Sequence, residues 1–549
     1  MKTMDELRFV ALGGAGEIGM NLSLYGCGGR WLMVDLGLGF ADESTPGIDI
    51  LVPDPGFIVE RREALDGIVL THAHEDHLGA VAVLWPKLRC PVYASPFAAA
   101  VLKRKLAEAG VKDVPLHLVK PGRRFDVGPF EVEYLSAAHS IPEGHVLVIR
   151  TAAGLAVHAT DWKLDPAPLV GAETDEDRLR AVGAEGVQAL LVDSTNAMVE
   201  GRAGSEGALR DSLTEIVAGC AGRIAVACFS SNIARIETIA HAAAANDRQA
   251  CLVGRSLWRM VEAARETGYL ADTPPFLTEH DVGYLPPERV VMVVTGSQGE
   301  RRSALSRIAA NDHPAVALEP GDTVVFSSRQ IPGNELAISR VQNRLVRQGI
   351  EVIVDGARET HVSGHPAREE LRALYEWLRP AAVVPIHGEA RHLFEQVALA
   401  RSAGVADALV AENGTMLRLM PGPVEVIGEV ETGRLGLDGK RLVPADGGTM
   451  RARHRIGFSG SAVATVVVDR RGALAADPKV TLHGVIEPDD AGEVEEEAID
   501  AMIDAIDDLS RQARRDDDNV AEAARRALAG TLRRTTGKRP LAEVHVVRV

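Results

Sequence analysis

Cysteine is scarce in this sequence, and its few occurrences are scattered. The five cysteines are Cys27, Cys90, Cys220, Cys228 and Cys251. An odd number of cysteines without a close pair disfavours a disulfide framework and a zinc ribbon. Reduced, mostly buried thiols are therefore expected.

Long apolar runs are also lacking. No uninterrupted apolar stretch in the sequence reaches the roughly 18 residues of a membrane span. The start of the chain, Met1 to Arg8, carries acids and lacks the basic-then-apolar layout of a signal peptide. We therefore expect no membrane segment and, by default, a cytoplasmic location.

Basic residues are too few to balance the acids. Lys and Arg total 60 against 77 Asp and Glu, which gives a formal net charge of -17. This balance disfavours a protein that holds nucleic acid by overall charge, although a locally basic groove or bound metal cations could still do so. Part of the acidity lies in Glu487 to Asp508, where an acidic helix face is expected.

What the chain does have is length. Its 549 residues exceed what one hydrophobic core usually supports, so two to four domains are expected. Hydrophobic content of 46% and charged content of 25% are ordinary for a globular protein.

Four side chains able to bind metals fall within six residues, at His72, His74, Asp76 and His77. The preceding Asp66 to Thr71 is typical of a buried strand, and Leu78 to Trp85 is typical of a helix that Pro86 would end. The cluster is thus predicted at a strand-to-helix turn, where α/β folds commonly bind ligands. Imidazole nitrogens with a carboxylate suit zinc, manganese or iron better than calcium or magnesium.

Three later strands are each followed by a similar side chain, at His139, Asp161 and His387. Alone, each could be a loop histidine or a turn residue. With the first cluster they predict two metal positions, one with His72, His74 and His139 and one with Asp76, His77 and His387. Asp161 is suited to bridge them, because one carboxylate has two oxygens. Asp35, at the end of another predicted strand, could orient one of the ligands.

Between Asp193 and Gly364, apolar strand candidates alternate with amphipathic stretches, which is typical of a doubly wound α/β domain. Glycine and hydroxyl residues punctuate its turns, as in Phe229 to Asn232. Such loops can bind phosphate or can be ordinary turns. After a predicted linker, a compact α+β unit is expected from about Arg455. Oligomerisation or substrate guidance is the expected role of that unit.

Several motifs together resemble a known family. The ligand pattern resembles the metallo-β-lactamase fold, and the inserted domain ending at His361-Val362-Ser363-Gly364-His365 resembles the β-CASP nucleases. Five further motifs, spread over most of the chain, resemble bacterial ribonuclease J. They are Gly13 to Gly19, Asp193 to Ala197, Thr295 to Glu300, Ile331 to Glu335 and Pro385 to Glu389.

The resemblance implies an α/β fold, namely a metallo-β-lactamase αββα sandwich with an inserted β-CASP α/β domain and a C-terminal α+β domain. The expected ranges are 1–205 and 361–430 for the metallo-β-lactamase domain, 206–360 for the β-CASP domain, 431–454 for a linker and 455–549 for the C-terminal domain. Two Zn²⁺ ions, or Mn²⁺ in some members, are the implied cofactors. Some members carry a structural Ca²⁺ near the position of Asp49, and the sequence leaves open whether this chain does.

The implied activity is hydrolysis of single-stranded RNA in RNA maturation and decay, such as rRNA processing and mRNA decay. A 5′-to-3′ exoribonuclease that favours 5′-monophosphate ends, with some endonuclease activity and 5′-phosphate products, is expected. The implied assembly is a homodimer or homotetramer, with partners in an RNA-degradation complex left open.

Site roles also follow from the resemblance. The catalytic candidates are Asp76, His365 and Asp193, with His365 to protonate or stabilise the leaving oxygen and Asp193 to orient it. Alternatively, His365 only hydrogen-bonds phosphate. The candidates to hold the RNA backbone or terminal phosphate are Ser230, Ser231, Asn232, His361, Val362, Ser363, Gly364 and His365.

Other readings compete with this one. A hydrolase on the same fold that acts on a small thioester or lactone would not need the long insertion. Ribonuclease Z, an endonuclease, lacks this insertion. An endonuclease or a DNA-processing relative stays open. A non-catalytic RNA-binding scaffold is disfavoured, because a scaffold has no need to retain all seven ligands.

Overall fold

The computed structural model describes residues 6–331 and 333–549. The start of the chain up to Asp5, and Pro332 of the Ile331–Glu335 motif, therefore lie outside the described residues. The chain forms two compact units: one runs up to Gly39 and from Val52 to Gly433, and the other combines Phe40–Leu51 with Arg434–Val549. Among the described helices, none has the length and apolar character needed to cross a bilayer.

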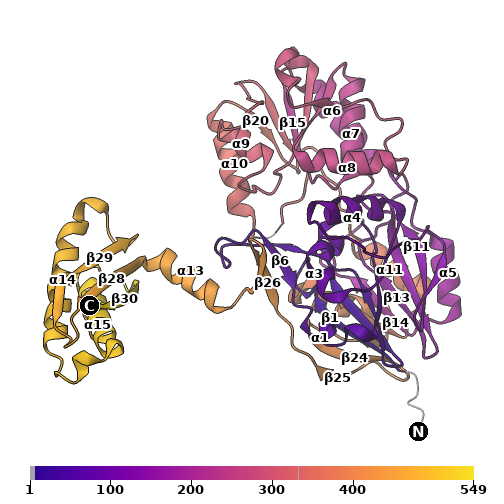
Figure 1. Cartoon of the computed structure of the whole chain (residues 1–549). Helices are drawn as coiled ribbons and strands as arrows, with labels where there is room; N and C mark the ends of the chain where they lie inside the picture. The colour runs from indigo at the N-terminus through magenta and orange to yellow at the C-terminus, as the bar shows by residue number, and fades with distance from the viewer. Residues whose placement is uncertain (1–5, 332) are drawn as a thin grey trace, which may run out of the picture. The chain divides into compact units, whose positions relative to one another are not determined.

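Two mixed sheets pack face to face in the first unit (Figure 1). The first has the order β25-β24-β1-β3-β4-β7-β8-β9, from β1 (Leu7–Gly13), β3 (Leu22–Cys27), β4 (Arg30–Val34), β7 (Leu65–Val69), β8 (Val92–Ala94), β9 (Leu116–Leu118), β24 (Thr415–Met420) and β25 (Glu425–Glu429). The second has the order β10-β11-β12-β13-β14-β21-β23, from β10 (Arg124–Val127), β11 (Phe130–Ala137), β12 (Gly144–Thr151), β13 (Gly154–Ala159), β14 (Ala189–Asp193), β21 (Ala382–Ile386) and β23 (Asp407–Ala408).

The core between these sheets explains why their strands are so apolar. Phe9 and Tyr25 from the first sheet meet Tyr134 and Val384 from the second in one buried cluster. Each such side chain, when fully buried, contributes about 1.5–3 kcal/mol of transfer free energy. Strands covered on both faces read as continuous hydrophobic runs, as β14 and β21 do.

Helices cover the outer faces of both sheets. Helices α3 (Val81–Leu88) and α4 (Pro96–Glu108) lie beside the first sheet, and α5 (Glu176–Glu185), α11 (Arg368–Leu378) and α12 (Ala390–Ser402) lie on the second. This is the predicted αββα sandwich. One detail of the prediction is wrong: Pro86 does not end its helix, because α3 continues through it to Leu88. Proline removes only one backbone donor, and burial of Trp85 and Leu88 holds the last turn in place.

The inserted segment forms a sheet of its own, in which all six strands are parallel. Its order is β17-β16-β18-β15-β19-β20, from β15 (Ile224–Ala227), β16 (Gln249–Val253), β17 (Leu277–Thr278), β18 (Val290–Val294), β19 (Thr323–Phe326) and β20 (Glu351–Ile353). The accompanying helices are α6 (Glu206–Gly219), α7 (Ile233–Ala245), α8 (Arg255–Glu266), α9 (Ala304–Ala309) and α10 (Glu335–Arg347), and they flank the sheet on both sides (Figure 1). The predicted doubly wound domain is confirmed.

A buried arginine joins the two points where the chain enters and leaves this insertion. Arg235, which is 0% exposed, donates from Nη2 to Glu206 Oε1 at 3.2 Å and from Nη1 to the Thr360 carbonyl at 3.3 Å. The same guanidinium donates to the Ser327 carbonyl at 2.9 Å. Loss of one partner would leave a buried charge uncompensated, so this network fixes the junction.

The second unit differs from the prediction at its start. Residues 431–454, predicted as a linker, contain the hairpin β26 (Arg434–Asp438) and β27 (Arg441–Pro444) and the first turns of α13 (Gly448–Ser459). The reason is a contact distant in sequence. Ile48 lies against Gly436, and Arg453 donates to the Pro46 carbonyl at 3.1 Å.

The rest of that unit follows the expected α+β pattern. A three-stranded sheet in the order β29-β28-β30, from β28 (Ser461–Val468), β29 (Leu474–His483) and β30 (Leu541–Arg548), packs against α14 (Ala491–Asp507) and α15 (Asp517–Thr536). The acidic stretch predicted as a helix face belongs to α14, whose Val494, Ala498, Met502 and Ile506 are buried at helical spacing.

A carboxylate cluster on the second sheet gives a first prediction. Arg178 donates to Glu133 Oε1 at 2.8 Å and Arg150 donates to Oε2 at 2.8 Å. Burial raises the pKa of Glu133, but the hydrogen bonds from both arginines outweigh burial and hold it below its usual range. We expect Glu133→Gln to lower the free energy of unfolding by about 1–3 kcal/mol at pH 7.

The pH dependence of this loss has a defined sign. A lowered folded-state pKa stabilises the fold above the unfolded pKa of about 4.3 and loses that effect as pH falls through the folded pKa. The difference in urea unfolding between wild type and Glu133→Gln should therefore shrink below about pH 4. The exposed Glu429→Gln is the control. A difference that persists at pH 3 would rule out this electrostatic origin.

Candidate metal centre

All seven predicted metal ligands meet at one edge of the sandwich. His72, His74, Asp76 and His77 follow β7, and His139, Asp161 and His387 follow β11, β13 and β21. Strand β12 is antiparallel to β11 and β13, whereas β13, β14 and β21 are parallel. The carboxyl ends of β11, β13, β14 and β21 therefore share one edge, and the loops after them converge there.

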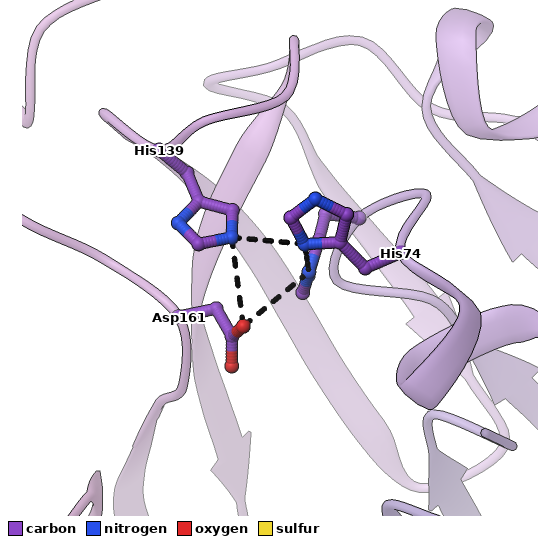
Figure 2. A group of neighbouring side chains, drawn as sticks. His74, His139 and Asp161 are labelled. Carbon is purple, nitrogen blue, oxygen red and sulfur yellow. Dashed lines mark hydrogen bonds and ion pairs between the residues drawn. The ribbon is translucent and has the colours of Figure 1, made fainter. Parts of the chain in front are cut away.

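The first ligand group consists of three imidazoles and one carboxylate oxygen (Figure 2). His74 Nδ1 lies 3.0 Å from both His72 Nε2 and His139 Nε2. Asp161 Oδ2 lies 3.6 Å from His72 Nε2 and 3.5 Å from His139 Nε2. The four atoms thus surround one point.

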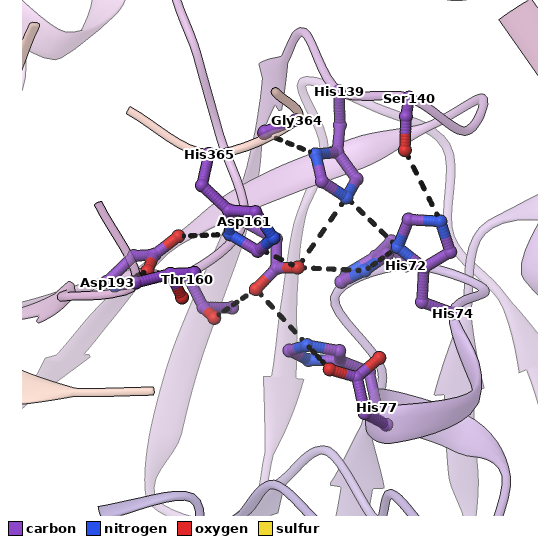
Figure 3. Close-up of polar contacts among 12 residues, drawn as sticks. His72, His74, His77, His139, Ser140, Thr160, Asp161, Asp193, Gly364 and His365 are labelled. Atoms are coloured by element: carbon purple, nitrogen blue, oxygen red, sulfur yellow. Dashed lines mark hydrogen bonds and ion pairs between the residues drawn. The ribbon is translucent and has the colours of Figure 1, made fainter. Parts of the chain in front are cut away.

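The second group uses the other oxygen of the same carboxylate. Asp161 Oδ1 lies 3.1 Å from His77 Nε2 and 3.3 Å from His387 Nε2. Asp76 Oδ2 lies 3.6 Å from each of these two nitrogens. Asp161 is therefore placed between two sets of ligands, with one oxygen facing each set (Figure 3).

The donor set fits divalent transition metals. Ligands about 2.0–2.2 Å from a tetrahedral ion lie roughly 3.3–3.6 Å from one another, close to the spacings observed here. Imidazole nitrogens combined with carboxylate oxygens are the donors that zinc prefers. The chain therefore provides a metal-binding site.

The electrostatics of the rings agree with this reading. Burial lowers the pKa of His74 to about 3 and holds those of His72 and His139 well below their usual value. These rings are neutral at pH 7, the form that binds a metal. For His77, burial opposes a charge, but Asp161, Asp76 and Asp35 together raise its pKa well above the usual value. These carboxylates favour a cation beside His77.

Most of the second ring nitrogens are also held. His77 Nδ1 lies 2.7 Å from Asp35 Oδ2, and the backbone N–H of Thr71 donates to Asp35 Oδ1 at 2.8 Å. His139 Nδ1 lies 2.6 Å from the Gly364 carbonyl. Such contacts fix the orientation of a metal-binding imidazole. Asp35 thus occupies the position expected of a residue that orients a ligand.

His365 and Asp193 lie beside the ligand groups. His365 Nδ1 is 2.7 Å from Asp193 Oδ2, and the His365 ring centre is 5.5 Å from those of both His139 and His387 (Figure 3). Burial opposes protonation of His365, but Asp193 and Asp161 outweigh it and raise its pKa to about 9. The contact with Asp193 engages Nδ1, which leaves Nε2 for other contacts.

Sequence reasoning missed Asn196, which holds the loop of His365. Its amide donates to Ser363 Oγ at 2.8 Å and to the His365 carbonyl at 3.0 Å, and its own oxygen accepts from Arg329 at 2.6 Å. Asn196 is 1% exposed. Its place three residues after Asp193 was a local signal, but its partners lie more than 130 residues away in the sequence.

The residues expected to bind RNA differ in whether their polar atoms are available to a ligand. Ser230 and Ser231 stay partly exposed before α7, whose Ala234 N–H points to the Ser140 carbonyl at 3.5 Å, beside the ligand His139. The Asn232 side chain caps α7 by accepting from the Arg235 N–H at 2.8 Å. Its oxygen is therefore already used, because the first turn of a helix has unsatisfied donors.

The residues from His361 to His365 also differ in whether their polar atoms are already hydrogen-bonded. Val362 is 4% exposed and packs beside Gly204. Ser363 accepts from Asn196 and Gly364 accepts from His139. His361 is partly exposed, and its Nδ1 is buried without a hydrogen-bond partner among the described residues. Of this motif, His361 and His365 have ring nitrogens left for a ligand.

Two glycines show how tightly the ligand loops pack. A Cβ on Gly37 would lie 1.7 Å from the Asp76 carbonyl, and one on Gly364 would lie 2.6 Å from the His139 ring. Only glycine permits these approaches. The Gly13–Gly19 motif serves the same purpose, since the His387 N–H donates to the Gly14 carbonyl at 2.6 Å and β2 (Ala15–Gly16) pairs with β22 (Gly388–Glu389). The motif is therefore a turn against the metal centre.

Asp49, near which some members of the family were expected to carry a structural Ca²⁺, lies outside the two ligand groups. It is exposed, and among the described residues the clusters able to hold a metal are those around Asp161 and Asp76. None of these clusters includes Asp49.

Comparison with known proteins assigns a family to every part of the chain that carries the site. Family models match residues 30–195 (beta-lactamase superfamily domain), 221–345 (ribonuclease J, beta-CASP domain), 349–410 (Zn-dependent metallo-hydrolase RNA specificity domain) and 448–549 (ribonuclease J C-terminal domain). A crystal structure of a protein of unknown function from Enterococcus faecalis V583 is 16% identical, with a TM-score of 0.51 over 75% of this chain and 99% of that one. That likeness concerns the fold alone.

The similarity to curated relatives extends over nearly all of the sequence. Ribonuclease J of Sinorhizobium meliloti is 45% identical over 99% of this chain and 98% of its own length. Ribonuclease J of Mycobacterium tuberculosis is 37% identical over 98% and 95%, and that of Thermus thermophilus is 37% identical over 79% and 78%. With the converging ligands and the inserted β-CASP sheet, these matches show that the chain belongs to the ribonuclease J family and is a metal-dependent ribonuclease.

Proposed function

We propose that this enzyme is a two-metal 5′-to-3′ exoribonuclease that favours 5′-monophosphorylated, single-stranded RNA and has some endonuclease activity. The observation that carries the two-metal part is the position of Asp161, whose two oxygens face two separate ligand groups. We assign His72, His74, His139 and Asp161 to one cation and Asp76, His77, His387 and Asp161 to the other. Zn²⁺ is the proposed ion, and Mn²⁺ the alternative.

The chemistry divides between the cations and the chain. Bound cations would make water nucleophilic near neutral pH and offset negative charge on the scissile phosphate. The chain orients the rings that hold them: Asp35 fixes His77, and Gly364 fixes His139. Buried Asp161 sets the separation of the two groups. Hydrolysis would leave a 5′-phosphate and a 3′-hydroxyl.

His365 is the proposed group at the leaving oxygen. Asp193 binds its Nδ1, so a proton on Nε2 can point toward substrate. Asn196 and Ser363 hold the backbone of the same loop, which restricts the ring to this position. General acid catalysis by a positioned histidine contributes typically 10²–10⁴-fold to a rate.

The proposed site for the 5′-phosphate is the partly exposed turn that precedes α7. Ser230 and Ser231 offer hydroxyl donors there, and the dipole of the 13-residue helix α7 favours an anion near its N-terminus. The same turn touches the His139–Ser140 loop through Ala234. His361, whose Nδ1 has no hydrogen-bond partner among the described residues, is a further candidate to bind phosphate. A terminal phosphate held here would place the first phosphodiester near the metal ligands.

Assembly and location complete the proposal. We propose a homodimer or homotetramer and domain limits near residues 205 and 360, with the second unit beginning after Gly433. The free, buried cysteines fit a reducing compartment, so we propose the cytoplasm. Partners in an RNA-degradation complex would act through the same RNA substrates.

The metal assignment predicts the behaviour of a ligand variant. His77→Ala removes one nitrogen from the second group, so bound metal per chain should fall by about one equivalent. Mutation of a residue that only orients a metal ligand typically costs about 10–100-fold in metal affinity or activity. Loss of a ligand itself should therefore lower RNA hydrolysis by more than about 100-fold. Metal analysis and a cleavage assay on the same preparation measure both. His483→Ala, on an exposed strand end, is the matched control. Full metal content and full activity in His77→Ala would refute the assignment.

The role of His365 is tested by separating binding from turnover. His365→Ala should lower kcat about 10²–10⁴-fold while leaving the affinity for RNA within about twofold. Asp193→Asn should lower kcat in the same direction, because it weakens the bond that orients the ring. Single-turnover cleavage and fluorescence anisotropy measure the two quantities. If His365→Ala lost only affinity, His365 would be a phosphate-binding residue instead.

The direction of degradation is tested with RNAs that differ only at the 5′ end. With 5′-monophosphate RNA, a time course should show mononucleotides from the earliest times, and 5′-triphosphate RNA should react more slowly. A DNA of the same sequence tests the choice of nucleic acid. Internal fragments that do not depend on the 5′ end would indicate an endonuclease, and faster cleavage of DNA would indicate a DNA-processing enzyme.

A further inference from the structure

The second unit contains a hollow at one end of its three-stranded sheet. Its volume is about 640 Å³, and its lining comes from two segments, the end of α13 and the turn after α15. The side chains that matter here are Arg455 and Phe458 from the first segment and Lys538 and Arg539 from the second. The proposed catalytic function uses none of these residues.

The three cations of the hollow carry uncompensated charge. Arg455 and Lys538 donate to backbone carbonyls, of Pro540 at 3.3 Å and Val485 at 3.2 Å. Within the described part of the chain, none of Arg455, Lys538 and Arg539 forms an ion pair with a carboxylate, and all three are exposed. By contrast, neighbouring Arg453 pairs with Asp438 at 2.6 Å, and Arg534 pairs with Glu497 at 2.7 Å.

The local sequence separates this patch from the acidic remainder of the unit. Residues 448–459 and 533–539 contain seven Lys or Arg and no Asp or Glu, in a chain whose formal net charge is -17. Two of the seven, Arg453 and Arg534, pair with carboxylates, the second with Glu497 of the acidic helix α14. Arg455, Lys538 and Arg539 therefore give this end of the sheet local positive charge in an acidic chain, which favours an anionic ligand.

Phe458 adds a second, independent feature. Its side chain is 87% exposed at the end of α13, although burial of a phenylalanine would be favourable. An exposed aromatic ring that lines the same hollow as unpaired cations is a combination that binds single-stranded nucleic acid, because bases stack on the ring and phosphates pair with the cations. An acidic protein partner would use the cations but has no need of the ring.

We propose that this hollow is a second RNA-binding site, in which Arg455, Lys538 and Arg539 hold phosphates and Phe458 stacks on a base. The inference rests on the proposed function, because it takes the substrate RNA as the ligand. RNA held here remains tethered to the enzyme, which raises its effective concentration at the metal centre. Long substrates should gain from this, and substrates too short to occupy two sites should not.

The test compares two triple variants of the full-length enzyme. One carries Arg455→Ala, Lys538→Ala and Arg539→Ala. The matched control carries Arg470→Ala, Arg471→Ala and Arg511→Ala, which removes the same charge from exposed positions. Arg470 and Arg471 follow the end of β28, whereas the hollow lies at its beginning, so the eight-residue strand separates the two sets. A third variant, Phe458→Ala, removes the ring alone.

The readout is kcat and KM on unstructured 5′-monophosphorylated RNAs of about four and about 40 nucleotides, because one binding module covers roughly 4–16 nucleotides. In the triple variant, KM for the long RNA should rise about tenfold, while kcat and the KM of the short RNA stay unchanged. The slope of log KM against log salt should fall by about 2, since each phosphate contact contributes roughly 0.7 on single strands. The control triple should match wild type.

Phe458→Ala distinguishes stacking from charge. Its KM for the long RNA should rise several-fold with an unchanged salt slope, because a base that leaves the ring releases no counterions. Circular dichroism of each variant should match wild type, as all the altered side chains are exposed.

Each other outcome overturns a defined part of the argument. A wild-type KM for the long RNA in both the triple variant and Phe458→Ala would refute the second site. A change in oligomeric state on size-exclusion chromatography would assign the hollow to a second copy of the chain. If wild type cleaved neither RNA, the proposed function would fail by itself. The anisotropy of a labelled 40-nucleotide RNA, compared between the two triples, would then still test the hollow.

Discussion

The structure depends on one buried carboxylate. Asp161 is 2% exposed, and its two oxygens face six other ligands in two groups. Burial raises the pKa of such a group, but His77, His387 and His365 outweigh burial and hold that of Asp161 well below the usual value. A buried charge of this kind is tolerated only when it is paired. The histidines that follow the converging strands supply that pairing, so the buried carboxylate depends on closure of the sandwich.

The backbone around the centre is held in an uncommon conformation. Asp35, Asp161 and His387 have φ values of 63°, 45° and 52°, in the left-handed region that non-glycine residues seldom adopt. Hydrogen bonds hold two of these backbones: the Asp35 N–H donates to the Val69 carbonyl at 3.0 Å, and the His387 carbonyl accepts from the Thr195 hydroxyl at 3.0 Å. The sheets therefore do more than carry the loops. They supply the packing energy that maintains strained ligands in position.

Sequence periodicity predicted the elements that obey local rules. The strand predicted over Asp66 to Thr71 is β7 (Leu65–Val69), and the acidic stretch Glu487 to Asp508 forms α14 (Ala491–Asp507), because burial patterns are local properties. Residues governed by distant partners could not be predicted in this way. Pro86 is tolerated inside α3, and the hairpin of β26 and β27 depends on Ile48, far earlier in the chain.

The same distinction holds for the site. The spacing of His72 to His77 predicted a metal centre, but the roles of Asn196, Asn232 and Val362 became visible only through their contacts.

A protein with a net negative charge that acts on RNA needs positive charge concentrated where the RNA binds. At the metal centre the sequence places carboxylates and imidazoles, so the attraction for phosphate there depends on bound cations. The hollow of the second unit uses fixed cations instead, and these need no metal. The two kinds of charge respond differently to conditions. Removal of metal abolishes the attraction for phosphate at the metal centre and leaves that at the hollow. Salt weakens both, and the loss of RNA affinity at the hollow grows with the number of phosphate contacts there. An enzyme arranged in this way can keep hold of a long RNA when its catalytic site is briefly without substrate, which a single metal-dependent site could not do.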